Sequence, residues 1–279
     1  TASNSTAVGG RALCSNTTGE RNQAFGNVAL ETNTTGNCNV AIGDRALQSN
    51  TTASNNTAVG VLALKANTTG NRNTALGTCS LSANTTANNN TAVGTCAMLK
   101  NTTGSTNVAV GYLSLCNNLT GAENTALGHG TLRNNTAGCN TAVGNDVLNA
   151  NTSGANNTGV GRCALGVNTT GGNNVAIGTG ALDANTTGAN NTAVGSRSLY
   201  ANTTADNNTA VGYQSLFANT TASNNTAVGL CSLNANTIGC RNTAVGLCSS
   251  LGNTTGNFNL SAGAYSLVCN STGNQNTAL

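Results

Sequence analysis

Hydrophobic and polar positions along this chain recur with a period of seventeen residues. When the Gly of each "TAVG"-like segment is numbered position 5, sixteen copies follow one another at steps of seventeen, except for one step of sixteen between Gly128 and Gly144. A fixed period of this length is typical of a solenoid, in which each copy forms one coil of a stack. We call each copy a rung and each of its seventeen positions a column.

The least variable columns indicate how a rung is built. Column 12 is always Asn, column 1 is Asn except at Ser5, column 9 is usually Leu, column 3 is usually Ala, and column 4 is apolar. Alternation over columns 2 to 4 predicts a short strand. Because the usual Thr of column 2 is replaced in some rungs by Val or Leu, we expect columns 2 and 4 to face inward and the Ala of column 3 to face outward. The replacements are Val40, Val108, Val175 and Leu260.

The rest of the rung is predicted from its length and its turn residues. Columns 8 to 11 are interpreted as a second strand, since seventeen residues leave little room for a helix with its turns, although one helical turn stays an alternative. "NTTG" at columns 12 to 15 is the expected return turn. The Gly of column 5 indicates either a positive φ or the close passage of another backbone. Columns 6, 7 and 10 vary freely and are expected to face solvent.

These observations predict an all-β fold, a parallel β-solenoid or β-roll of about sixteen 17-residue rungs. Residues 1–279 form a single repeat array, which we interpret as a fragment of a longer chain. Backbone hydrogen bonds between rungs and Asn ladders in columns 1 and 12 would hold it together, as in cross-β stacks. The predicted core ladder consists of Leu13, Leu47, Leu64, Leu182, Leu199 and Leu216 from column 9 and Val59, Val194, Val211 and Val228 from column 4.

Composition narrows the class of protein. Charged residues make up 6% of the chain, aromatic residues 3%, and Pro and Trp are absent. The net charge of +3 is small and the basic residues are scattered, so we expect no nucleic-acid partner. No apolar run is long enough to span a bilayer, which predicts no membrane insertion of this segment.

The sequence offers little chemistry for an enzyme. His129 is the single histidine, and the seven acidic residues are dispersed among the rungs without an evident pair. No C-x-x-C spacing and no phosphate-binding loop occur. We therefore expect no catalytic activity, no cofactor and no bound metal.

Cysteines recur in column 7 of neighbouring rungs. Cys79 and Cys96 form one such pair, and Cys231 and Cys248 form another. Residues stacked in register about 4.8 Å apart lie within the Cα separation that a disulfide allows. The pairs are candidate disulfides, and bridging would indicate an oxidising, extracellular setting.

Sequons for N-glycosylation occur in most rungs at column 12. An outward Asn would carry carbohydrate, whereas an inward Asn ladder would require the same invariance without it. A second set, "NNT", begins at column 17, for example at Asn55 and Asn190. The candidate glycosylation sites of column 12 are Asn16, Asn33, Asn50, Asn67, Asn84, Asn101, Asn168, Asn185, Asn202, Asn219 and Asn253.

A recurring motif suggests a relationship. In "NCNVAIGDRAL" (37–47) and "GNNVAIGTGAL" (172–182), the chain resembles the head repeats of trimeric autotransporter adhesins. It is similar also to the Asn-Thr-Gly repeats of viral and phage tail-fibre proteins. The resemblance covers the whole chain and implies a parallel β-roll, commonly trimeric, displayed on a cell or virion surface. Adhesin heads have a shorter rung, and neither a stalk nor an anchor occurs in this segment.

The favoured function is therefore a structural and adhesive segment of an extracellular, cell-surface or virion-surface fibre. Its expected partners are copies of itself, in a homo-oligomer, trimer or filament joined through the Ala of column 3, and a host surface or its glycans. Ice binding by Thr arrays is the alternative. It needs two outward Thr ranks flanking an inward residue, whereas the Thr of columns 13 and 14 are adjacent and the Thr of column 2 is expected to face inward.

Overall fold

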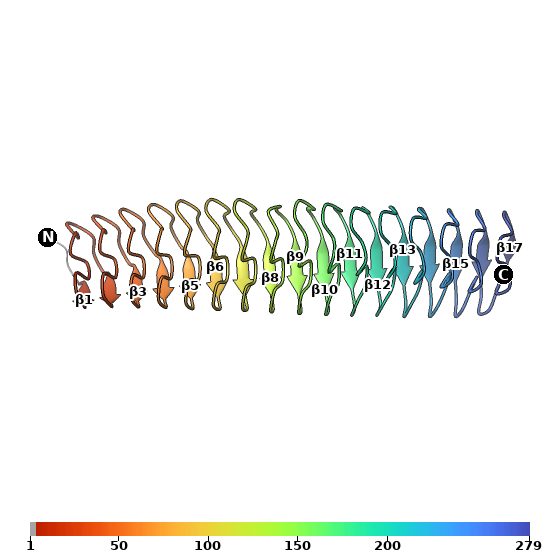
Figure 1. The fold of residues 1–279 in the computed structure, drawn as a ribbon, viewed down its shortest axis with the longest axis horizontal. Coiled ribbons are helices and arrows are strands. Elements are labelled where there is room, and N and C mark those ends of the chain that lie inside the picture. The colour runs from red at the N-terminus through yellow and green to blue at the C-terminus, as the bar shows by residue number, and fades with distance from the viewer. Residues whose placement is uncertain (1–3) are drawn as a thin grey trace. The chain divides into compact units, whose positions relative to one another are not determined.

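The structure is a computed structural model that describes residues 4–279, and it confirms an all-β parallel solenoid. Contacts divide the chain into two compact units, residues 1–139 and 140–279. The boundary falls at the end of the one sixteen-residue repeat. Each unit is built from the same coil, in which one three-residue strand is followed by turns (Figure 1).

The strands of each unit lie side by side in chain order (Figure 1). The first unit contains β1 (Thr6–Val8), β2 (Gln23–Phe25), β3 (Val40–Ile42), β4 (Thr57–Val59), β5 (Thr74–Leu76), β6 (Thr91–Val93), β7 (Val108–Val110) and β8 (Thr125–Leu127). The second contains β9 (Thr141–Val143), β10 (Thr158–Val160), β11 (Val175–Ile177), β12 (Thr192–Val194), β13 (Thr209–Val211), β14 (Thr226–Val228), β15 (Thr243–Val245), β16 (Leu260–Ala262) and β17 (Thr277–Ala278).

Neighbouring strands pair in parallel and in register, so each residue lies over the same column of the next rung. In the pairing of β13 with β14, for instance, Thr209 lies beside Thr226, Ala210 beside Ala227 and Val211 beside Val228. The other strand pairs within each unit have the same register, as β1 with β2, β4 with β5, β6 with β7 and β12 with β13 show. The predicted stacking of like residues is therefore confirmed.

The orientation of the strand is opposite to the prediction. From β2 to β15 the Ala of column 3 is buried, as Ala58 and Ala193 show, while columns 2 and 4 are partly or fully exposed. Only at the two ends of the array, at Ala7 and Ala278, does the Ala of column 3 reach solvent. The column-4 residues predicted for the core, Val59, Val194, Val211 and Val228, lie at the outer surface. The interior beside the strand is narrow and admits only a methyl group. The exchange of Thr for Val in column 2 thus reflects an outward β-branched surface.

Columns 8 to 11 form neither the preferred strand nor the alternative helix. Columns 8 and 9 both point inward, and Ala46 and Leu47 are fully buried. Two consecutive inward residues are incompatible with a strand, whose side chains alternate. Leu47 instead has a φ of +50°, and column 7 is left-handed too, as Arg45 shows with a φ of +57°. Backbone bonds still join the rungs here, for example from Leu47 N to Ala63 O at 3.0 Å.

The Leu of column 9 forms the apolar core. Leu47, Leu64, Leu182, Leu199 and Leu216 are fully buried, as predicted, whereas Leu13, in the first rung, is partly exposed. Together with the small residues of columns 3 and 8 they fill each coil. Since one rung buries so few apolar atoms, it depends on its neighbours for stability.

Two Asn ladders close the interior, as predicted. Asn185 of column 12 donates Nδ2 to Asn168 Oδ1 at 2.8 Å and to Gly188 O at 2.9 Å. Asn174 of column 1 donates Nδ2 to the same Gly188 oxygen at 2.9 Å, and its Oδ1 accepts the Asn191 backbone N–H at 2.9 Å. The two columns therefore hold one carbonyl from both sides. Only a side chain with both N–H donors and a carbonyl acceptor satisfies this pattern, which explains their invariance.

Both proposed reasons for the Gly of column 5 hold at once. Gly195 has a φ of +135°, and a Cβ added there would lie 2.6 Å from the carbonyl carbon of Gly212 in the next rung. The other Gly residues of this column in residues 4–279 also have positive φ, from +115° at Gly161 to +144° at Gly26. An L side chain is disfavoured by both the backbone conformation and the close approach.

One rung pair shows how tightly the interior limits side-chain volume. Val147 replaces the usual small residue of column 8, and the next rung has Gly159 where column 3 normally has Ala. A Cβ on Gly159 would lie 2.5 Å from Val147 Cγ1. The extra bulk of one residue is thus offset by the loss of a methyl group from the other.

This pairing predicts a rescue by double substitution. Gly159→Ala is expected to lower the free energy of unfolding of the second unit by about 1–3 kcal/mol, because the methyl group overpacks the core against Val147. Val147→Ala in the same background should recover most of that loss, which urea unfolding of the single and double variants would measure. Purely additive effects of the two substitutions would contradict the steric explanation.

A second departure near the C-terminal end of the array is polar. Ser250 occupies column 9 in place of Leu, and Ser261 occupies column 3 in place of Ala. Their hydroxyl oxygens are 2.8 Å apart, and Ser249 Oγ lies 2.6 Å from Ser261 Oγ. The two substitutions therefore compensate for one another, because each buried hydroxyl has a partner.

Candidate functional surfaces

The coil presents one uniform surface and one variable surface. The uniform surface, which we call the Thr/Val face, consists of the outward residues of columns 2 and 4. The variable face consists of columns 6, 7 and 10. No charged residue occurs in columns 2 and 4. All Arg, Asp and Glu residues lie elsewhere, nine of them on the variable face and the other six in columns 16 and 17, beside the return turn.

The Thr/Val face is regular and unusually apolar for a solvent-exposed sheet. Val8 is 56% exposed, Leu76 47% and Ile177 40%. Parallel register sets the spacing of this face at about 4.8 Å between rungs and about 6.6 Å between columns 2 and 4. Contiguous exposed apolar surface of this kind is typical of an interaction site.

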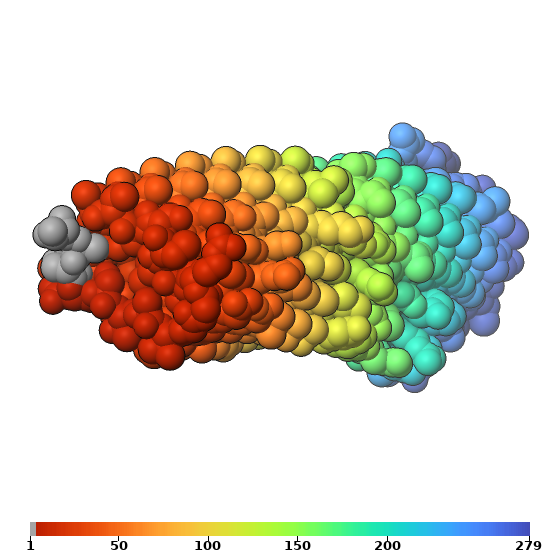
Figure 2. All heavy atoms as spheres, turned by 60° about the vertical axis from the view of Figure 1, so that its left-hand side comes forward, coloured from red at the N-terminus to blue at the C-terminus, as the bar shows by residue number. Residues whose placement is uncertain are grey.

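The variable face carries the polar and aromatic side chains. Figure 2 shows that outward side chains of the first unit, coloured red to yellow, form parallel rows from rung to rung. Aromatic side chains in the same column of neighbouring rungs interact: Tyr112 stacks on His129 in the first unit with ring centroids 5.6 Å apart, and Tyr200 stacks on Phe217 in the second unit at 5.3 Å. His129 is exposed, as expected from its variable column.

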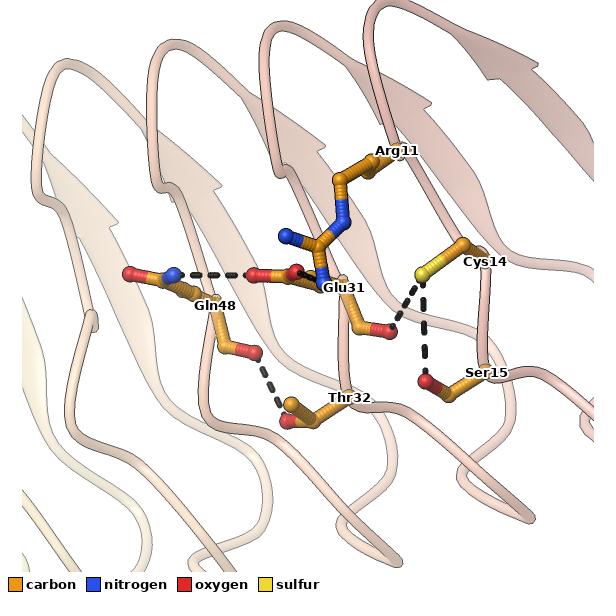
Figure 3. A network of polar contacts seen from close by, with 6 residues as sticks. All are labelled: Arg11, Cys14, Ser15, Glu31, Thr32 and Gln48. Carbon is orange, nitrogen blue, oxygen red and sulfur yellow. Dashed lines mark hydrogen bonds and ion pairs between the residues drawn. The ribbon is translucent and has the colours of Figure 1, made fainter.

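A network on the variable face of the first unit satisfies its own charges (Figure 3). Arg11 forms an ion pair with Glu31, and Gln48 Nε2 donates to the other Glu31 oxygen at 2.9 Å. Glu31 is only 7% exposed, because the arginine and glutamine side chains cover it. Cys14 Sγ donates to Glu31 O at 3.6 Å. This cluster stabilises three successive rungs and leaves no open carboxylate for a ligand.

The candidate disulfides are not formed. Cys79, Cys96, Cys231 and Cys248 are all free thiols in the structure. Side chains stacked in register run parallel to one another, whereas a disulfide needs the two Cβ atoms to turn towards each other. Burial raises the pKa of Cys96, and the adjacent Cys79 raises it further through charge repulsion and a hydrogen bond. Burial and, to a lesser degree, Cys248 raise the pKa of Cys231.

These shifts predict a pH-dependent order of thiol modification. At pH 7.5, iodoacetamide should modify Cys96 several-fold more slowly than the exposed Cys38, because a raised pKa lowers the thiolate fraction. The rate at Cys96 should keep rising above the ordinary thiol range. The raised pKa of Cys96 also links pH to folding. The stability that the neutral Cys96 thiol contributes is present below the pKa of Cys96 in the unfolded chain, and it is lost as pH rises through its pKa in the folded chain. Peptide mass spectrometry between pH 7 and 10 measures these rates, and parallel profiles at the two residues would refute the prediction.

The column-12 sequons are sealed inside the coil. Asn33, Asn50, Asn67, Asn84, Asn101, Asn168, Asn185, Asn202, Asn219 and Asn253 are fully buried, and their Nδ2 atoms donate within the ladder. Asn16 is partly exposed but also donates Nδ2 to Gly19 O at 2.9 Å. The inward interpretation of column 12 is therefore correct. A glycan on Nδ2 would replace a ladder donor and has no room in the fold.

The "NNT" sequons have a different environment. Their first residues occupy column 17 and are exposed, as at Asn55, Asn89 and Asn190. The backbone of column 17 adopts the left-handed conformation, with a φ of +59° at Asn190, and Asn adopts this conformation readily. The same tripeptide signal therefore marks a buried ladder in one column and an accessible surface in another, and only the fold separates the two.

Residues 4–279 contain neither a metal-binding cluster nor a membrane-spanning helix. No group of three His, Cys, Asp or Glu side chains in this part of the chain is arranged to hold a metal ion. Nor does the described part contain a helix that could cross a membrane.

Comparison of the chain with protein-family models, with curated proteins and with solved structures finds no match.

Proposed function

We propose that this chain is a structural and adhesive segment of an extracellular or virion-surface fibre, which displays repeated surface columns for multivalent attachment. The observation that carries the proposal is the division of the coil into a uniform Thr/Val face and a variable face. The Asn ladders and the parallel register hold every outward column at a constant spacing. Repeated weak sites held in this way bind with high avidity when a partner engages several at once.

The partner for the Thr/Val face is a second copy of the chain. This face has no charge to repel a copy, and its β-branched side chains lose little entropy when they pack. The contact predicted from the sequence was through the Ala of column 3, which is buried and cannot form it. We assign the contact to the Thr/Val face instead. Sheets that pair through such faces are typical of stable oligomers and fibrils.

Sedimentation velocity tests this association. The unmodified chain should sediment as an oligomer or filament, and Val211→Lys together with Val194→Lys should shift it towards the monomer. Gln214→Lys, which adds a charge on the variable face instead, is the matched control and should leave the sedimentation coefficient unchanged. A monomeric unmodified chain at tens of micromolar would overturn the proposal of self-association.

Ice binding is the second candidate, because the strands place the Thr of column 2 outward, although the other outward rank, column 4, is apolar and not the second Thr rank expected of an ice binder. The inward Ala of column 3 is flanked by outward Thr and outward Val, so two regular ranks share one face. Column 13 is less suitable, because its hydroxyls donate to the next rung, as from Thr186 Oγ1 to Thr203 O at 3.0 Å. Thermal hysteresis that disappears in Thr209→Lys would establish this function. Absence of hysteresis in a chain that self-associates would leave the fibre proposal in place.

A further inference from the structure

A hollow of about 240 Å³ opens on the variable face of the second unit. Its lining includes Arg162, Thr179, Gly180, Asp183, Arg197 and Tyr200, which come from three successive rungs. Tyr200 is held in place by its stack on Phe217, whose ring is within 7° of parallel.

The hollow exists because one side chain is missing. Gly180 occupies column 7, where the adjacent rungs have Cys163 and Arg197. The backbone does not require glycine here: Gly180 has a φ of +65°, and Leu62 and Leu113 occupy the same column at +60° and +56°. A Cβ on Gly180 would lie 3.5 Å from the Tyr200 ring, an ordinary contact. The space is therefore a property of this rung's side chains.

The charges around the hollow are not satisfied by one another. Within residues 4–279, Arg162 and Arg197 form no ion pair, and the Asp183 carboxylate accepts no hydrogen bond. Arg11 and Glu31 of the first unit occupy comparable columns of adjacent rungs but are paired. Asp183 is half-buried, and burial raises its pKa, an effect that the positive charge of Arg162 offsets only in part. Two open guanidinium groups and one open carboxylate thus face the same space.

We infer that this hollow binds a carboxylate-bearing sugar unit of a glycan. Two arginines on either side of the Thr179–Gly180 rung suit a carboxylate, which guanidinium groups bind through two parallel hydrogen bonds. The Asp183 carboxylate accepts a hydrogen bond from a sugar hydroxyl, and the Tyr200 ring offers an apolar surface for the sugar body. The site's net charge of +1, from two Arg and one Asp, complements a monoanion. This inference deepens the proposed adhesive function and rests on it.

Saturation-transfer NMR on the full chain tests the site, with glucuronic acid as the probe. Glucuronate should receive saturation and bind with a Kd on the order of millimolar, while glucose and acetate should bind at least about tenfold more weakly. Equal transfer to glucose would overturn the role of the carboxylate. Equal transfer to acetate would overturn the role of the sugar body.

Two variants locate the binding. Arg197→Ala should weaken glucuronate binding about tenfold or more through loss of a charge-assisted pair. Gly180→Leu should abolish it by filling the hollow, and it should fold because column 7 already carries Leu elsewhere. Arg241→Ala removes a remote cation that lies 5.2 Å from the Phe258 ring and should bind like the unmodified chain. Unchanged glucuronate binding by a folded Gly180→Leu variant would overturn the inference. The sedimentation test of self-association involves none of these residues, so its outcome is independent of this one.

Discussion

Gly195→Ala is expected to lower the free energy of unfolding of the second unit by about 4 kcal/mol or more, from a disfavoured φ together with overpacking. The new Cβ would lie 2.6 Å from the Gly212 carbonyl carbon, and the backbone there has a φ of +135°. Relief would require the two rungs to separate. Separation would break the interstrand bond from Gly212 N to Val194 O, now 2.7 Å long. Urea unfolding followed by circular dichroism measures the loss.

Gly180→Ala is the matched control for this substitution. It is also a positive-φ glycine of the second unit, but its Cβ would meet only Tyr200 and Arg197 side-chain atoms at 3.5 Å or more. The expected cost is about 1 kcal/mol, since a non-glycine residue adopts this left-handed conformation at a modest penalty. If both variants lost the same stability, close approach between rungs would not be the reason for glycine in column 5.

Asn185→Ala is expected to cost about 3–5 kcal/mol, because it leaves buried polar groups without partners. Asn168 Oδ1 loses its donor, and Asn202 Nδ2 loses one of its two acceptors. Gly188 O retains only the bond from Asn174. Asn185→Asp should not rescue the loss, because a carboxylate has no N–H to donate and would be buried without a cation.

A neighbouring exposed residue gives the comparison for the ladder. Thr187 lies in the same turn with its side chain exposed, and Thr187→Ala should change the free energy of unfolding by less than about 0.5 kcal/mol. Denaturant midpoints of the two variants would show the contrast. Similar midpoints would mean that the turn, rather than the Asn ladder, stabilises the coil.

In a stacked array such losses should also spread beyond the substituted rung. Each rung contacts mainly its neighbours, and its Asn amides bond to the rungs before and after it. Stability is then approximately a sum of rung and interface contributions. A central substitution weakens two interfaces, whereas one in a terminal rung weakens only one.

The repeat pattern predicts only part of the hollow on the variable face of the second unit. Gly180 and Asp183 could be assigned to solvent-facing columns from the repeat. The pattern does not predict that Arg162 and Asp183, twenty-one residues apart, form no ion pair. Arg11 and Glu31 are twenty residues apart and do form one. The column pattern does not specify side-chain conformation, so it could not separate these two cases.

By itself, the sequence determined the stacking of this protein. A period of seventeen, invariant Asn in two columns and Gly in a third require like residues to lie over one another, because only then does each amide meet its own copy. The tertiary structure alone decided which side of each coil is the interior. The alternating Thr-Ala-Val strand could place either Ala or the Thr and Val inside. The choice depends on the space that remains beside the Leu and Asn side chains when the coil closes. That space fits a methyl group, so Ala is buried, Thr and Val form the outer face, and the Asn of column 12 is sealed from solvent.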